Sequence, residues 1–264
     1  MEVQTDLEKW LFKEDMKVFD YYFKDINFDI ELLESYKKIY VLVSGGFDST
    51  LLAEWISYHY PNKTYFVNCF NPYESSDVLD YYSKKDNFIS IRPKKGDNLN
   101  YGSVLRESFM KLPEARKLRA EKKYHKKIFP CCYHIKHKHF YSSKIFKEEG
   151  SVIISGIKRG DGSQRRIWLL QMSRGTNPRN QSSGKPTFLH RHTRGELYCY
   201  PFRDHTTREL DEEIKELLWD KFPTLKHSGC KICPVLVLFN LKREGKRYEC
   251  SVDYAKKLGV WEEI

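Results

Sequence analysis

The pattern of apolar and polar positions along the chain predicts strands that alternate with helices. An unbroken apolar run at 39–43 (IYVLV) is typical of a central parallel strand covered on both faces. Residues 49–60 follow with the spacing of a helix, and 64–70 (TYFVNCF) again favour a strand. Such alternation indicates an α/β protein with an open, mainly parallel sheet flanked by helices.

Shorter elements continue this alternation further along the chain. The pattern predicts strands at 88–91, 151–155 and 197–201, and helices at 6–23, 76–84, 101–112, 134–147, 206–221 and 252–258. Residues 175–186 have loop composition. We therefore divide the chain into an N-terminal helical segment (1–38), an α/β domain (39–225) and a small cysteine-containing C-terminal tail (226–264).

The first predicted strand runs into a polar, glycine-rich turn, SGGFDS at 44–49, just where a helix begins. Ligands of open parallel sheets bind beyond the carboxyl ends of the strands, and a helix N-terminus there suits phosphate. Gly45 and Gly46 would let the backbone approach the phosphate, while Asp48 would bind Mg²⁺ or cap the helix. Hydroxyl donors are expected from Ser44, Ser49 and Thr50. The alternative is an ordinary glycine turn.

Charge and composition narrow the class of partner. Lys and Arg number 46 against 36 Asp and Glu, a net charge of +10 that favours polyanions such as nucleic acid, unless it only reflects a lysine-rich composition. No apolar run approaches the length of a membrane span, and the N-terminus is too charged for a signal peptide. We expect a cytoplasmic protein with no membrane partner.

Four of the seven cysteines form two tight pairs, the adjacent Cys131 and Cys132 and a CxxC at Cys230 and Cys233. Four soft thiolates suit either a [4Fe–4S] cluster or a Cys₄ Zn²⁺ site, although adjacent cysteines are unusual for zinc. A redox disulfide or buried free thiols are further alternatives. Cys69 and Cys199 fall in predicted strands, and we expect them in the core.

Together these motifs resemble one protein family. SGGFDS matches the PP-loop, SGGxDS, of the ATP pyrophosphatases. Four further segments resemble, in the right order, those of the phosphoadenylyl-sulfate (PAPS) reductase family. They are PCC with Lys136, SGIKRGDGSQRR at 155–166, PFRDHTTREL at 201–210 and HSGCKICP at 227–234. The chain is thus similar to the PAPS-reductase-like branch of the PP-loop superfamily over residues 39–235.

This resemblance implies a fold, a reaction and a set of site residues. The fold would be that of the adenine nucleotide α-hydrolases, and the reaction would split ATP between its α- and β-phosphates with Mg²⁺. ATP would be bound by Ser44, Gly45, Gly46, Asp48, Ser49, Thr50 and Gly156, with Asp48, Ser49, Lys158 and Arg159 in catalytic roles. Arg165 and Arg166 would hold pyrophosphate or the acceptor. Cys131, Cys132, Cys230 and Cys233 would hold a [4Fe–4S] cluster, with Zn²⁺ as the alternative.

The chain departs from the family in two places that bear on the reaction. Lys158 replaces the arginine of a GxR motif, and the family's acid–serine pair is split into Asp161-Gly162-Ser163. Sulfonucleotide reductases carry a catalytic cysteine in an ECGxH context, whereas Cys250 is followed here by Ser251 and no histidine. The intact PP-loop instead resembles ATP pyrophosphatases of sulfur insertion, such as DNA-phosphorothioation enzymes and cluster-bearing tRNA thiolases. A reductase and a binding-only protein are the alternatives.

Expected partners follow from that reading. The acceptor would be a nucleic acid, with DNA slightly favoured over tRNA because no tRNA-binding module is recognisable, and a cysteine desulfurase or another donor would supply sulfur. The chain could also pair with a second copy of itself as a homodimer. The basic run at 116–127 would track phosphates or form a solvated helix face, and 175–194 would order on nucleic acid or stay disordered. His125, His134, His137 and His139 would lie near the cysteines as surface or supporting residues.

Overall fold

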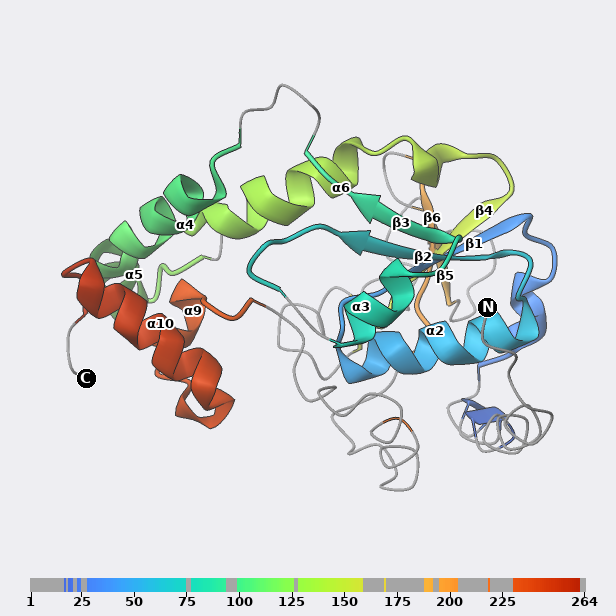
Figure 1. Ribbon diagram of the computed structural model, residues 1–264, viewed down its shortest axis with the longest axis horizontal. Coiled ribbons are helices and arrows are strands. Elements are labelled where there is room, and N and C mark those ends of the chain that lie inside the picture. The colour runs from blue at the N-terminus through green and yellow to red at the C-terminus, as the bar shows by residue number, and fades with distance from the viewer. Residues whose placement is uncertain are drawn as a thin grey trace. The chain divides into compact units, whose positions relative to one another are not determined.

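The chain forms a six-stranded, mostly parallel sheet with flanking helices in a computed structural model (Figure 1). This arrangement confirms the predicted α/β class. The structure describes residues 17, 19–20, 23–24, 28–74, 77–93, 99–125, 128–158, 169, 188–191, 195–203, 218 and 230–261. The predicted helix at 206–221 and most of that at 6–23 lie outside these residues.

The order of the strands places the first of them inside the sheet. The strands are β1 (Lys38–Leu42), β2 (Thr64–Cys69), β3 (Phe88–Ile91), β4 (Ser151–Ile154), β5 (Leu189–Arg191) and β6 (Leu197–Cys199), in the order β3-β2-β1-β4-β6-β5. β1 pairs in parallel with β2 on one side and with β4 on the other, so that Val41 lies opposite Phe66 and Ile154. The carboxyl ends of these three strands therefore share one edge.

The sheet ends at an edge strand, β5, that the sequence pattern did not predict. β6 pairs in parallel with β4, whereas β5 runs antiparallel to β6. β5 is only three residues long and falls within the segment predicted as a mobile basic loop, so no alternation marked it. The other strands match their predicted positions to within two residues.

The helices match their predictions less closely. α2 (Phe47–His59), α3 (Asp77–Ser83) and α4 (Tyr101–Met110) lie where they were expected, and α5 (Leu112–Ala120) continues the chain into the basic run. The single helix predicted at 134–147 is instead a π-helix η3 (Cys132–His137), a short α6 (Lys138–Ser142) and a 3-10 turn η4 (Ile145–Lys147). At the C-terminal end, α9 (Pro234–Leu238) and a longer α10 (Lys246–Lys257) are present.

Aromatic packing fixes α2 against its neighbours. The ring of Phe23 stacks on that of Trp55 with centroids 3.6 Å apart, and both side chains are almost fully buried. Asp20 accepts a hydrogen bond of 2.7 Å from the indole nitrogen of Trp55. The hydroxyl of Tyr82 on α3 donates to the buried carboxylate of Glu54 on α2. Buried aromatic area with satisfied polar groups holds the helix in place.

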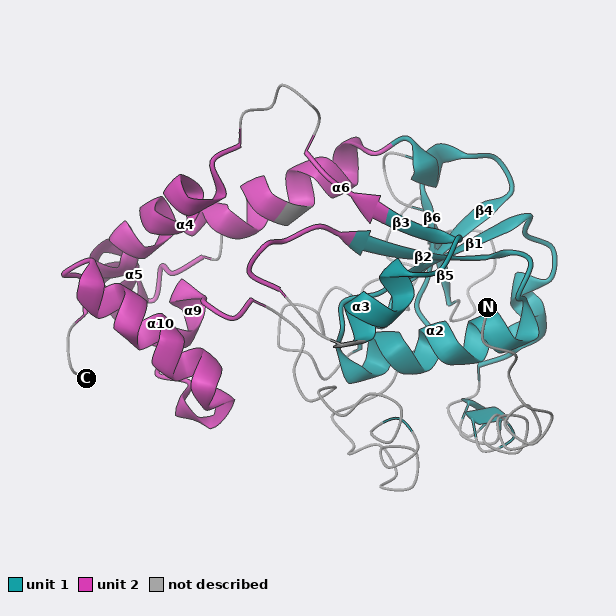
Figure 2. Cartoon of the chain, in the orientation of Figure 1, with its two compact units in different colours: residues 1–68, 76–89, 144–227 teal, residues 69–75, 90–143, 228–264 magenta. Residues whose placement is uncertain are grey.

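Contacts divide the chain into two compact units, each discontinuous in sequence (Figure 2). The first unit (1–68, 76–89 and 144–227) contains β1, α2 and β4, and the second (69–75, 90–143 and 228–264) is mainly helical. The helical unit has its own core, which includes Phe109, Leu112, Val237 and Ala255. The domain boundaries expected from the sequence stay predictions.

Two arginines of the basic run serve the packing of the helical unit. Arg119 donates to the carbonyl of Leu238 at 2.6 Å and lies over the ring of Phe239, 4.7 Å from its centroid. Arg116 donates to the carbonyl of Val260 at 3.2 Å. The helix α5 ends at Ala120, so the run is neither one continuous helix nor wholly a solvated face.

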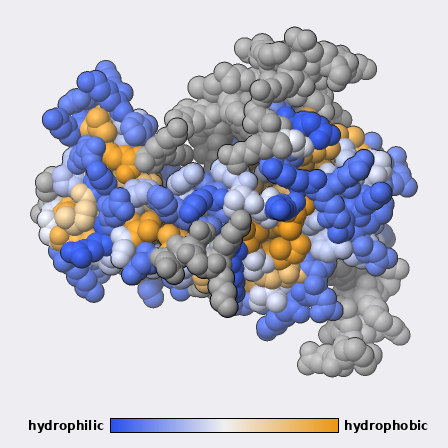
Figure 3. All heavy atoms as spheres, turned by 90° about the horizontal axis from the view of Figure 1, so that it is seen from above, coloured by the Kyte–Doolittle hydropathy of each residue, from blue (hydrophilic) through white to orange (hydrophobic). Residues whose placement is uncertain are grey.

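Among the coloured residues of the face that Figure 3 draws, most of the surface is hydrophilic, with smaller hydrophobic patches between the hydrophilic side chains. This surface agrees with the large share of charged residues, 31% of the sequence. Within the described ranges, no helix combines the length and apolar character that crossing a membrane would need.

Candidate functional site

The SGGFDS turn leads directly from β1 into α2. Gly45 has φ of +74°, in the left-handed region that glycine adopts without strain, and Gly46 is the extended N-cap residue of α2. The hydroxyls of Ser49 and Thr50 both donate to the carbonyl of Gly46 at 2.9 Å. The Ser44 hydroxyl lies 3.0 Å from that of Ser49. These bonds hold the turn in one shape.

The same bonds change the expected roles of the hydroxyl groups. Ser49 is buried and Thr50 is fully buried, and their hydroxyls are used within the turn. Backbone N–H groups at the start of α2 are therefore the donors that the turn offers. The first N–H groups of a helix lack acceptors within the helix, and no side-chain bond caps α2 among the residues described. With the helix dipole, such a terminus favours an anion.

The chain beyond β4 comes very close to this helix terminus. A Cβ atom on Gly156 would lie 3.2 Å from the backbone nitrogen of Ser49 and 3.3 Å from the carbonyl carbon of Asp48. The contact follows from the sheet, because β4 pairs in parallel with β1 and their carboxyl ends share an edge. Only glycine at this position leaves the backbone nitrogen of Ser49 uncrowded.

Two residues further on, Lys158 binds Asp48. The ammonium nitrogen lies 2.9 Å from Oδ1 and 2.8 Å from Oδ2, and the side chains are only 17% and 25% exposed, respectively. Asp48 therefore does not cap α2, one of its two predicted roles, because Gly46 is the N-cap. Lys158 puts a positive charge where the resemblance expects one. The other predicted cations, Arg159, Arg165 and Arg166, lie outside the described residues.

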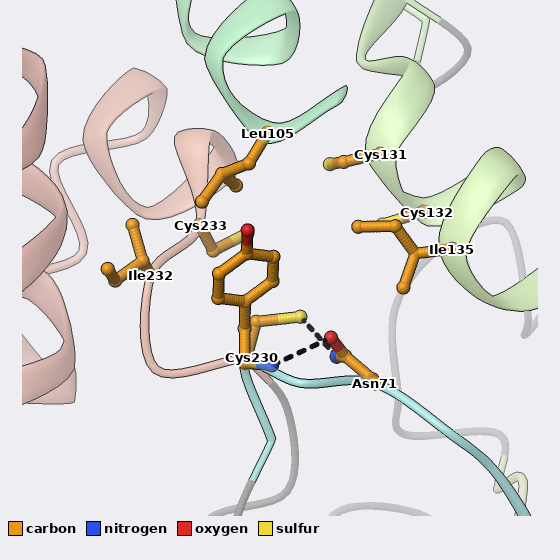
Figure 4. Close-up of a pocket in the computed structure, with 9 residues that line it drawn as sticks. Asn71, Leu105, Cys131, Cys132, Ile135, Cys230, Ile232 and Cys233 are labelled. Atoms are coloured by element: carbon orange, nitrogen blue, oxygen red, sulfur yellow. Dashed lines mark hydrogen bonds between the residues drawn. The ribbon is translucent and has the colours of Figure 1, made fainter. Parts of the chain in front are cut away.

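All four paired cysteines line a single cavity in the helical unit (Figure 4). Cys131 and Cys132 lie on one side of it, and Cys230 and Cys233 lie on the other. The other lining residues are Asn71, Tyr73, Leu105, Ile135 and Ile232. Two segments far apart in the sequence thus bring the four sulfurs to one largely apolar space.

Asn71 is a polar residue of this cavity that the sequence analysis missed. Its side-chain nitrogen donates to the sulfur of Cys230 at 3.0 Å, and its side-chain oxygen accepts from the backbone nitrogen of Tyr73 at 3.1 Å (Figure 4). Asn71 is only 4% exposed, so its orientation is fixed. Its position two residues after β2, at the ligand-binding edge of a parallel sheet, was the available signal.

Two serines fix the backbone of the cysteines. The hydroxyl oxygen of Ser108 accepts from the backbone nitrogen of Cys131, and that of Ser251 accepts from the backbone nitrogen of Cys233, both at 2.9 Å. Each serine also donates to a carbonyl of its own helix. Ser251, which departs from the reductase motif, is fully buried and has a structural role here.

Two thiols of the cavity, those of Cys131 and Cys233, favour their protonated form. A hydrogen bond with Cys132, together with burial, raises the pKa of Cys131 far above its ordinary value. Burial raises the pKa of Cys233 to about 11, and the nearby Cys230 adds to this rise. Thiolates at neutral pH would thus need a compensating positive charge in the cavity, such as that of a metal.

By donor type, the four cysteines suit an iron–sulfur cluster or a Zn²⁺ ion. The described parts of the chain contain no group of three or more His, Cys, Asp or Glu side chains arranged to hold a metal ion. The buried hydroxyl of Tyr124 has no hydrogen-bond partner in the described structure. Burial raises the pKa of Tyr124, and charges on Cys233 and Cys132 would add to this rise.

The remaining cysteines differ in burial. Cys199 is fully buried in the core of the first unit, as predicted, whereas Cys69 at the end of β2 is partly exposed and does not belong to that core. Cys250 lies within α10 and is partly exposed. None of these three lines the cavity.

The predicted histidines do not contribute to the cavity either. His125, His134 and His137 are exposed, and His139 is buried on α6. Among the residues described, none of the four lines the space between the cysteines. The expectation of surface histidines is therefore confirmed for three of them.

Comparisons with known proteins assign neither a family nor a function to the chain. The chain matches no model of a known protein family and no curated protein. The functional argument therefore depends on the motifs and on the geometry of the two sites. These sites are the α2 terminus with Gly156 and Lys158, and the four-cysteine cavity.

Replacing Gly156 with alanine should damage the α2 terminus selectively. The added methyl group would crowd the backbone nitrogen of Ser49, so we expect the affinity for ATP–Mg²⁺, the ligand that the resemblance implies, to fall roughly tenfold or more, since each lost charge-assisted hydrogen bond is worth about 1.5–3 kcal/mol. Gly102→Ala is the matched control, because its methyl group would meet only Asn100 at 3.4 Å. Equilibrium binding and melting temperature should be measured together. Unchanged affinity in Gly156→Ala would contradict this geometry.

The raised pKa of Cys233 predicts a distinctive alkylation profile. In reduced, metal-free protein, its reaction with iodoacetamide should keep rising with pH toward a midpoint near 11, because only the thiolate reacts. At pH 8 its thiolate fraction should be roughly a hundredfold below that of an ordinary thiol. Mass spectrometry of the labelled peptide gives the rate, and the same peptide in urea is the control. A plateau already reached near pH 9 in the folded protein would refute the predicted shift.

Proposed function

We propose that this protein is an ATP pyrophosphatase that adenylates an acceptor oxygen, on a nucleic acid, for sulfur insertion. The observation that carries the proposal is the convergence of the SGGFDS turn, Gly156 and Lys158 at one helix N-terminus. Two of the motifs that resemble the PAPS-reductase-like branch of the PP-loop superfamily, SGGFDS at 44–49 and the beginning of SGIKRGDGSQRR at 155–158, fall at this terminus. The four-cysteine cavity adds a site for sulfur chemistry.

The α2 terminus suits binding of the ATP phosphates. Gly45, Gly46 and Gly156 leave the backbone open to a phosphate, and the N–H groups at the start of α2 would donate to its oxygens. Asp48 is the carboxylate available for Mg²⁺. When Mg²⁺ takes Asp48, Lys158 would exchange its present partner for a phosphate oxygen. The pair thus keeps both charges in place before ATP arrives.

The chemical step then follows from these charges. The acceptor oxygen attacks the α-phosphorus, the bond to the bridging oxygen of the β-phosphate breaks, and pyrophosphate leaves. Lys158 and the N–H groups of α2 would stabilise the negative charge that develops on the phosphate oxygens. No lysine of the Walker type is present in the turn, which fits cleavage at the α-phosphate rather than γ-phosphoryl transfer.

The second step would use the cysteine cavity. Cys131, Cys132, Cys230 and Cys233 would hold a [4Fe–4S] cluster, which would supply or carry the sulfur that displaces AMP. Asn71 would orient Cys230 through its hydrogen bond to the sulfur, and Ser108 and Ser251 would fix the cysteine backbones. A Zn²⁺ ion is the alternative occupant.

The reductase alternative has less support. Cys250 lies in the interior of α10, a helix whose Val252 and Ala255 are packed in the core of the helical unit, so this cysteine is not at a mobile end. A sulfonucleotide reductase would release sulfite with thioredoxin and would not use ATP. A binding-only protein would bind ATP without releasing pyrophosphate.

An assay with α-labelled ATP tests the proposal. Anaerobically purified protein with Mg²⁺ should release AMP and pyrophosphate in the presence of tRNA or duplex DNA, and the polymer that stimulates release names the acceptor. Asp48→Ala should lower the rate by roughly 10²–10³-fold, as for other lost electrostatic contacts to a transition state. Asp80→Ala, an exposed carboxylate on α3, is the control. No pyrophosphate under any condition would refute the proposal.

Metal analysis tests the occupant of the cavity. After anaerobic reconstitution with iron and sulfide, the protein should contain about four irons per chain and absorb in the visible range. Cys131→Ser and Cys230→Ser should each lose most of this iron, whereas Cys250→Ser should retain it, because Cys250 does not line the cavity. One Zn²⁺ per chain with no visible absorption would favour the zinc alternative.

A further inference from the structure

The helical stretch that carries two of the cavity cysteines turns aromatic rings outward on its opposite side. Tyr133 is 55% exposed and Tyr141 is 43% exposed, and the exposed His137 lies between them at a spacing of four residues. Cys131 and Ile135, on the inner side, are buried and line the cavity. One side of η3 and α6 therefore faces the cysteines while the other presents a row of rings.

The rings of this row present flat faces at defined angles. Those of His137 and Tyr141 are nearly parallel, with centroids 5.8 Å apart and an angle of 16° between the planes. Tyr133 packs edge-on against His134, with centroids 5.2 Å apart. Single exposed tyrosines are common on protein surfaces, but the described structure has only Met110 besides these two among its exposed large hydrophobic side chains. Their occurrence in one row is thus the informative feature.

The chain segment that carries this row has charged side chains of a single sign. Residues 122–143 contain six lysines and four histidines and no aspartate or glutamate. The exposed His134 and Lys138 lie next to the rings on the same helical stretch. Aromatic faces combined with nearby cations are the means by which proteins bind single-stranded nucleic acid, because bases stack on the rings while phosphates meet the cations.

Other anionic partners fit this surface less well. An anionic membrane would attract the same charges, but helices that bind membrane surfaces insert Leu, Phe or Trp side chains. The outward row here consists of tyrosine and histidine rings, with no aliphatic residue among Tyr133, His137 and Tyr141. A duplex would meet the lysines but would keep its base faces stacked and out of reach.

We propose that the aromatic row, defined as Tyr133, His134, His137, Lys138 and Tyr141, binds unpaired nucleotides of a nucleic acid strand. Bases stack on the tyrosine rings and the phosphates lie near Lys138. The inference rests on the proposed function and deepens it, because it makes the acceptor a single strand or an extruded nucleotide. Cys132 precedes Tyr133 and lines the cavity, so a nucleotide bound at this end of the row lies next to the sulfur site.

Fluorescence anisotropy with labelled strands tests this surface. The strands are about ten nucleotides long, which is within the usual range for sites that bind single strands. The probes are oligothymidylate, oligouridylate, an abasic strand of equal length and charge, and a duplex. The wild-type protein should prefer strands with bases over the abasic strand. Tyr133→Ala with Tyr141→Ala should weaken oligothymidylate binding roughly tenfold or more and leave abasic binding unchanged. Tyr133→Phe with Tyr141→Phe should retain the affinity, since stacking needs only the ring, and Met110→Ala is the exposed control.

Several results would overturn the inference. They are an equal loss on the abasic strand, no loss with the alanine pair, tighter binding of the duplex, and no binding of any strand. The measurement uses no ATP, so it is independent of the pyrophosphate assay. Base-dependent binding without ATP cleavage would keep this surface and refute the proposed function, whereas ATP cleavage without base-dependent binding would refute the surface alone.

Discussion

The parallel pairing of β1 with both β2 and β4 is the constraint on which the candidate nucleotide site depends. It places the turn after β1 beside the chain that leaves β4, although more than 100 residues separate them in sequence. The result is a backbone approach at Gly156 so close that a single methyl group would meet the Ser49 nitrogen at 3.2 Å. A shift of one residue in the β1–β4 register would move Gly156 and Lys158 away from the helix terminus together.

The close approach of the chain after β4 also places Lys158 beside Asp48, the aspartate of the turn at the positive end of α2. An anion-binding terminus with its own carboxylate would repel phosphate, but Lys158 binds both oxygens of Asp48 in a partly buried setting. Opposite charges at this separation are weakly screened when partly buried. The terminus therefore keeps its positive dipole and its neighbouring N–H groups, and in the proposed function the carboxylate would exchange Lys158 for Mg²⁺.

The sequence pattern predicted most of the strands and the meeting of Cys131, Cys132, Cys230 and Cys233 at one place. It predicted the details of the helices poorly. Strands such as 39–43 and 151–155 are continuous apolar runs, whose pattern depends only on burial on both faces. The edge strand β5 is only three residues long, too short for an alternating pattern, and a helical pattern does not separate the π-helix at Cys132–His137 from an α-helix. The sequence pattern also predicts hydroxyl donors to phosphate at Ser49 and Thr50, whereas their bonds to Gly46 are visible only in the folded turn.

The cysteine cavity connects folding with its proposed occupant. Its sulfurs come from 131–132 and 230–233, so two separate segments must meet before four ligands exist, and a third supplies the hydrogen bond from Asn71 to Cys230. Burial and thiol hydrogen bonding hold Cys131 and Cys233 protonated, so an occupant must displace protons while it neutralises thiolates. Binding free energy gained in this way also stabilises the helical unit, because the unfolded chain has no such site. The aromatic row lies on the other side of the same helical stretch, so an ordered cavity would also fix the spacing of the rings at the surface.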